Sequence, residues 1–136
     1  MLRVAQGIQS RVPAHPLWSE QVIVEALDSE EGRSLPAEIM LLHAGEMLLL
    51  SQPGEVFSET AVALRARLRA LGYATPMVVG CANGSLHAYL PPPKAFEEGG
   101  YEPQSALRLG LSHRFQERVW QAVEPLLRQR AASLQD

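Results

Sequence analysis

Residues 45–72, GEMLLLSQPGEVFSETAVALRARLRALG, contain an apolar run, a Pro-Gly turn and an amphipathic segment in direct succession. Ser58 is a favourable N-cap residue, and Gly72 suits the position just beyond a last helical turn. Apolar side chains recur between them on one helical face, while most of the arginines point away; the apolar set is Ala61, Leu64, Leu68 and Leu71. The stretch therefore predicts a strand, a tight turn and a helix.

Segments on either side of this unit predict further strands. Downstream, PMVVGCA (76–82) is short and nearly all apolar, as expected of a central strand with both faces covered. The order strand, helix, strand predicts a right-handed crossover that joins a parallel pair. Upstream, two apolar runs within 37–51 predict a hairpin with Gly45 in its turn. Residues 21–27 alternate polar and apolar side chains, as a half-buried strand does.

The C-terminal third predicts helices. Residues 93–98 follow a run of prolines and can form one or two helical turns before Gly99-Gly100 ends them. A long final helix is expected over 112–131, with a kink or a break at Pro125. Its expected apolar stripe comprises Phe115, Val119, Ala122 or Val123, and Leu126.

These segments predict a single α/β domain over residues 1–136, with a mixed sheet of about four to five strands, a crossover helix and a long C-terminal helix. Residues 1–36 contribute an N-terminal strand and loop in which no motif is recognised. The net charge of −3 argues against a nucleic-acid or anionic-membrane partner. Cys81 is the only cysteine, which excludes an internal disulfide and a thiolate zinc cluster. The sequence contains no signal peptide and no run long enough to span a bilayer, so we expect a cytoplasmic protein without an integral membrane segment.

Three polar stretches follow predicted strands or close loops. A Pro-Gly turn delivers Glu55 just before the helix, and an Asn-Gly turn delivers His87 and Tyr89 after the next strand. In open α/β sheets, ligands usually bind at this edge. A carboxylate, an imidazole and a phenol side by side suit general acid–base chemistry or the binding of a hard cation. The stretches are QPGEVF (52–57), CANGSLHAY (81–89) and FEEGGYE (96–102).

Each of these residues also has an ordinary structural explanation. Glu55 can interact with the free amides at the start of its helix. His87 can be a solvated loop histidine, and Tyr89 can bury its ring while its hydroxyl finds a hydrogen-bond partner. No single motif among them identifies a chemistry.

In combination, however, the motifs resemble the end of the catalytic domain of the neutral/alkaline, non-lysosomal ceramidase family. The similar segments are GEMLLLSQPGEVFSETAVALRARL, MVVGCANGSLHAYLPPPKAFEEGGYE and SALRLGLSHRF, within residues 37–127. The resemblance implies a zinc-dependent amidohydrolase fold and a lipid substrate, an N-acyl sphingolipid cleaved into a fatty acid and a sphingoid base. Members of this family are often secreted.

The resemblance also implies roles for individual residues. Glu55 matches the family's glutamate zinc ligand, and Tyr89 matches its tyrosine ligand. Because the loop between Asn83 and Tyr89 is one residue longer than the family's pattern, the second ligand position falls to Tyr89 or His87. The pair Tyr101-Glu102 matches a Y-E element. We assign Asn83, His87, Tyr101 and Glu102 to the surrounding pocket.

The histidine ligands of the family have no counterpart in this chain. Its histidines are His15, His43, His87 and His113, and none forms the expected H-x-H pair. A catalytic zinc takes about three protein ligands, so the resemblance leaves an incomplete zinc site and a chain that we expect to be inactive on its own. A homo-oligomer or a second polypeptide would then complete the site.

Two alternatives remain open at this stage. A half-domain detached from its neighbours exposes apolar surface, so the chain can instead be a non-catalytic interaction or oligomerisation module. It can also be a small hydrolase that combines His87 with a histidine of a partner chain across a dimer interface.

Overall fold

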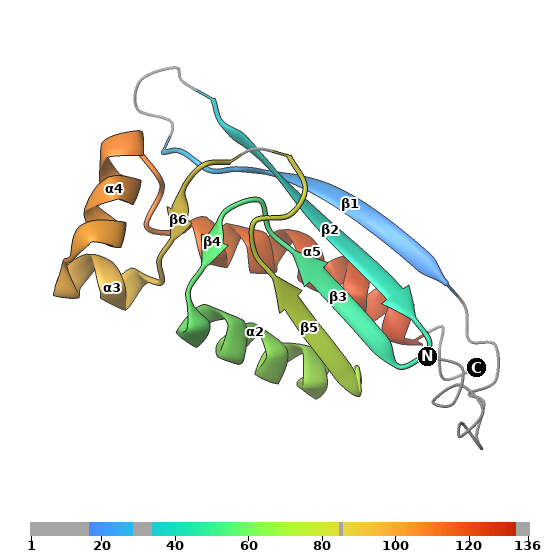
Figure 1. Ribbon diagram of the computed structural model, residues 1–136. Helices are drawn as coiled ribbons and strands as arrows, with labels where there is room; N and C mark the ends of the chain where they lie inside the picture. Colours follow the sequence, from blue (N-terminus) through green and yellow to red (C-terminus); the bar gives the residue numbers. More distant parts are fainter. Residues whose placement is uncertain (1–16, 29–33, 85, 133–136) are drawn as a thin grey trace, which may run out of the picture.

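The computed structural model describes residues 17–28, 34–84 and 86–132, and its main feature is one four-stranded sheet (Figure 1). The strand order is β1-β2-β3-β5. The first three strands are antiparallel neighbours, and β5 runs parallel to β3. The predicted mixed α/β sheet with a long C-terminal helix is therefore confirmed. The strands are β1 (Trp18–Glu25), β2 (Pro36–Ala44), β3 (Met47–Ser51) and β5 (Thr75–Val79).

The crossover from β3 to β5 passes through helix α2 (Ser58–Ala70), so the predicted parallel pair is confirmed. We expect Ser58 to be the N-cap of this helix, and this expectation is wrong. Phe57 occupies that position with an extended backbone, and the Ser58 hydroxyl donates to the Glu59 carboxylate at 2.9 Å. The expectation of a central strand at 76–82 is also wrong: β5 is the edge strand of the sheet, and Met77 on its outer face is 45% exposed.

A single hydrophobic core lies on one face of the sheet. Helix α5 (Phe115–Ala132) passes behind β1, β2 and β3 in Figure 1. Its buried side chains share one cluster with those of α2 and with the inward-facing residues of the strands. The cluster is centred on Ile39, Leu41, Leu48, Leu50, Leu64, Leu68, Phe115, Val119, Val123 and Leu127. Helices therefore cover one side of the sheet.

The C-terminal helices differ from the prediction in three respects. After α3 (Pro93–Glu98), a further helix, α4 (Tyr101–Leu109), occupies a stretch for which we had expected no helix. Helix α5 is not broken at Pro125, which lies on its exposed side, where water can satisfy the carbonyl that loses a donor. Leu127, rather than Leu126, completes the buried stripe at four-residue spacing. Among the described helices, none is long and apolar enough to cross a membrane.

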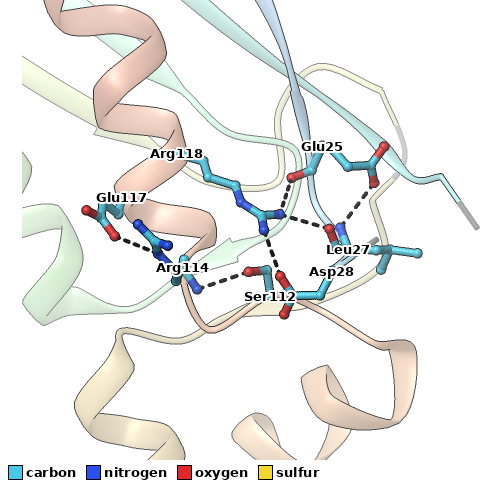
Figure 2. A network of polar contacts seen from close by, with 7 residues as sticks. All are labelled: Glu25, Leu27, Asp28, Ser112, Arg114, Glu117 and Arg118. Carbon is cyan, nitrogen blue, oxygen red and sulfur yellow. Dashed lines mark hydrogen bonds and ion pairs between the residues drawn. The ribbon is translucent and has the colours of Figure 1, made fainter. Parts of the chain in front are cut away.

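A polar network ties the end of β1 to α5 (Figure 2). The Arg118 guanidinium donates to the carbonyls of Glu25 at 3.3 Å and Leu27 at 2.8 Å, and to the Asp28 carboxylate at 2.7 Å. Alongside it, the Ser112 amide donates to the Ala26 carbonyl at 2.9 Å. One planar guanidinium thus satisfies backbone groups that the strand leaves unpaired where it ends.

Candidate functional site

The Pro-Gly turn is buried and brings three backbone segments into close contact. The Gly54 carbonyl accepts a hydrogen bond from the Cys81 amide at 2.8 Å, and the Glu55 amide donates to the Ala88 carbonyl at 2.9 Å. A Cβ atom on Gly54 would lie 2.5 Å from the Ala88 oxygen, so only glycine allows this approach. The turn therefore fixes the position of Glu55 against the segment that carries Tyr89.

Glu55 and Tyr89 are direct partners in a second, two-stranded sheet. Its strands, β4 (Glu55–Val56) and β6 (Tyr89–Leu90), run parallel, with Glu55 opposite Tyr89 and Val56 opposite Leu90. Residues opposite one another in adjacent strands project to the same face. The structure thus brings together the two residues that the sequence singled out as ligands.

The Tyr89 phenol lies in negatively charged surroundings. The Glu55 carboxylate is the largest influence that raises the pKa of Tyr89 above its ordinary value, followed by burial, Tyr101 and Glu102. The rings of Tyr89 and Tyr101 meet edge to face, with centroids 5.9 Å apart. This cluster lies where α4 packs against β6. Glu55, Tyr89, Tyr101 and Glu102 therefore form one acidic and phenolic group.

Two hollows open beside this group. Glu55, His87 and Tyr89 line the first, of about 310 Å³, together with Cys81 and Ser105. The second, of about 420 Å³, is also lined by Glu55 and Tyr89, together with Glu59 and Glu102. The sequence did not single out Cys81, Ser105 or Glu59 as site residues. Glu59 could have been found from its place in the first turn of α2, whereas Ser105 belongs to the helix that we had not expected.

Asn83 lines neither of these two hollows. Its backbone is left-handed, with φ of 62°, and its side-chain amide donates to the Ser51 hydroxyl at the end of β3. It lines a neighbouring hollow of about 300 Å³ with Ile23 and Glu38. This hollow shares Pro53, Gly84 and Leu86 with the one that holds Glu55 and Tyr89.

The histidines do not converge on Glu55. His87 lies exposed in the first hollow, whereas His43 is buried between the rings of Trp18 and Tyr73, at centroid distances of 5.4 and 5.8 Å. His113 stacks on Phe96 with centroids 4.1 Å apart, and His15 lies outside the described residues. Within 17–28, 34–84 and 86–132, no three His, Cys, Asp or Glu side chains gather as metal ligands would. Two oxygen donors fit part of a zinc site and fall short of the three that a catalytic zinc takes.

A comparison with solved structures finds the same fold within a much larger protein. The neutral ceramidase from Pseudomonas aeruginosa matches 74% of this chain with a TM-score of 0.58 and 22% sequence identity. The match takes up 16% of the ceramidase chain. No family model matches the sequence, and neither does any curated protein. The chain therefore has the fold of one segment of a neutral ceramidase.

Proposed function

We propose that this protein is a ceramidase-derived domain that supplies Glu55 and Tyr89 to a zinc-dependent amide-hydrolase site, completed by histidines of a second polypeptide. The observation that carries the proposal is the pairing of Glu55 with Tyr89 across β4 and β6. The structural similarity to a neutral ceramidase supports the proposal. The sequence resemblance that assigned ligand roles to Glu55 and Tyr89 is to ceramidases as well. The substrate class would be an N-acyl sphingolipid.

The electrostatics of the cluster favour a bound cation. Glu55 and Glu102 both raise the pKa of Tyr89 and so hold its phenol protonated, and a positive ion among these oxygen atoms would reverse that effect. When bound, zinc would acidify a water molecule and polarise the amide carbonyl. Glu55 and Tyr89 would hold the ion, Tyr101 would fix the orientation of the Tyr89 ring, and His87 is placed to reach into the same hollow. Because the donors from this chain are too few, we derive no hydrolytic step for the chain alone.

Calorimetric titration of zinc into the metal-free protein tests this proposal. We expect binding that Glu55→Gln weakens about tenfold or more, since even an indirect supporting residue of a metal site contributes 10- to 100-fold. Glu97→Gln is the matched control, because Glu97 is an exposed glutamate of α3 that lines neither hollow. Equal zinc affinity in the wild type and Glu55→Gln, or no binding by the wild type, would contradict the proposal.

A second candidate function, a non-catalytic interaction module, is favoured by a different feature. Apolar side chains occupy the face of the sheet opposite α5, and we consider that face separately below.

A further inference from the structure

The face of the four-stranded sheet that points away from α5 is apolar over β2, β3 and β5, whereas β1 presents Ser19, Gln21 and Glu25 there beside Ile23; we call it the outer face. Strand register places its apolar side chains in adjacent rows. Among the described residues, none of these side chains belongs to the hydrophobic cluster between sheet and helices, and Ile23 and Met77 are 60% and 45% exposed. Three of the protein's four methionines lie here. The apolar members are Ile23, Met40, Leu42, Met47, Leu49, Met77 and Val79.

Three of the four strands, β2, β3 and β5, have the composition of strands that are covered on both sides. Runs such as IMLL in β2, MLLL in β3 and MVV in β5 are apolar at inward and outward positions alike. Such continuous runs are typical of strands buried on both faces, whereas a sheet with one solvated face alternates apolar and polar residues. The described helices cover only the inner face. On the outer face, the described part of the chain covers the end at Ser51, which is buried and accepts a hydrogen bond from the Asn83 side chain; over the rest, the pattern favours a second layer.

Charge is confined to one end of the outer face. Among the outward positions of the four strands, the charged residues are Glu38 and Glu25, which lie near the same end of the β1–β2 ladder. The Glu25 carboxylate is already engaged by the Ser34 hydroxyl and by the amides of Leu27 and Leu35. The rest of the face would bury no charge on docking, and a core depleted of charged residues is typical of protein interfaces.

The area of the outer face allows a small dimer interface. At the usual strand spacing and rise, its outward positions span about 400 Å² in plan. Side chains that stand up from the sheet expose more than this plan area. Two such faces give about 800 Å² in plan, so with their upright side chains a dimer would lie at or below the lower end of the roughly 1,200–2,000 Å² that stable interfaces bury.

We propose that two copies of this chain pack outer face to outer face, forming a two-layer sheet sandwich with the helices outside. A second copy is the partner that fits, because identical twisted sheets stack face to face about 10 Å apart with strands nearly aligned. A two-fold axis perpendicular to the strands places the Glu38 end of one sheet over the Thr75 end of the other. The Glu38 carboxylates of the two copies therefore stay apart. Flexible methionines then interdigitate between the layers.

Light scattering and sedimentation of the full chain test this inference. The expected mass is about 30 kDa, twice the 14.9 kDa of one chain. Leu49, opposite Leu42 and Met77 in the register, lies at the centre of the outer face. Leu49→Glu should raise the dimer dissociation constant about 100-fold or more, because it buries an unpaired charge. Val62→Glu is the control, since Val62 is a 57% exposed apolar residue on α2, away from the sheet, and it should leave the constant unchanged.

Misfolding of the variant is separated from loss of the interface by a charge-swap pair. An equimolar mixture of Leu49→Glu and Leu49→Lys chains should associate more tightly than either alone, which unfolded chains would not do. A wild-type monomer at high micromolar concentration overturns the inference, and so does a dimer that Leu49→Glu leaves intact. Binding of the monomer to phosphatidylcholine vesicles, abolished by Leu49→Glu, would overturn it in favour of a lipid surface. None of these outcomes depends on zinc or on Glu55.

Discussion

Replacing Gly54 with alanine is expected to lower the free energy of unfolding by about 3 kcal/mol, the upper part of the range for overpacking a filled site. The added Cβ would lie 2.5 Å from the Ala88 carbonyl oxygen and 2.9 Å from Cγ of Leu90. The first of these neighbours is backbone and belongs to the segment that pairs with β4, so it cannot move without disturbing the ladder. Both hydrogen bonds of the turn, from Cys81 to Gly54 and from Glu55 to Ala88, would be strained.

Urea unfolding measures this effect, with Gly45→Asn as the control. Gly45 has a φ of 63° and open space around its Cα, and asparagine tolerates that backbone conformation. The control should therefore change the free energy of unfolding by less than about 0.5 kcal/mol. If Gly54→Ala were as mild as Gly45→Asn, the Pro-Gly turn would not be the close contact that positions Glu55.

Arg118→Ala is the second large expected effect, a loss of about 2 kcal/mol in the free energy of unfolding. Removing the guanidinium leaves the carbonyls of Glu25 and Leu27 without this donor and leaves Asp28 without its ion pair (Figure 2). The side chain is 32% exposed, so water compensates only in part. Arg118→Lys should recover part of the loss, because lysine keeps the charge but not the planar set of donors.

The loss should shrink at acid pH. The pKa of Asp28 is lowered, first by a hydrogen bond with Ser112 and then by Arg118. A carboxyl group whose pKa is lowered on folding stabilises the protein above its unfolded pKa of about 4 and loses that contribution as the pH falls through the folded value. The difference in thermal unfolding between the wild type and Arg118→Ala should therefore narrow as the pH falls below about 4. It should not vanish, because the bonds to the carbonyls of Glu25 and Leu27 do not titrate. Arg114→Ala is the control: its ion pair with Glu117 is 70% exposed on the arginine side, and an equally large loss there would contradict the special role of Arg118.

Long elements with a clear period could be predicted from the sequence. The spacing of Leu64 and Leu68 predicted helix α2, and Gly45 between two apolar runs predicted the β2–β3 hairpin. Both predictions are confirmed because the apolar pattern extends over many residues in each element. Helix α4 could not be predicted in the same way. It begins directly after two glycines and contains Pro103 in its first turn, where a missing amide costs little.

The position of β5 illustrates a different limit. Its apolar run correctly indicated a strand, but its neighbours depend on contacts distant in the sequence. The chain places it at the sheet edge, with Met77 turned outward. Apolar composition measures how much surface is suited to burial and does not reveal whether the same chain or another supplies the cover.

The candidate site was accessible only in part. Strands of two residues, such as β4 and β6, have no detectable period, and their pairing depends on the buried turn at Gly54. Glu55 and Tyr89 were singled out by the turns that precede them, and a family resemblance then gave them roles as ligands. Asn83 lines the neighbouring hollow. The geometry of Asn83 depends on its bond to Ser51, some thirty residues earlier, which no local pattern reveals.

The most direct test of the account is the titration of Tyr89, followed by NMR of the tyrosine ring carbons in the wild type, Glu55→Gln and Glu97→Gln. If the Glu55 carboxylate and the Tyr89 phenol share one site, the pKa of Tyr89 lies above the ordinary tyrosine value of about 10. It should then fall toward that value in Glu55→Gln and stay unchanged in Glu97→Gln. An identical pKa of Tyr89 in the wild type and Glu55→Gln would show that the two groups do not meet, and the proposed site would be lost with them.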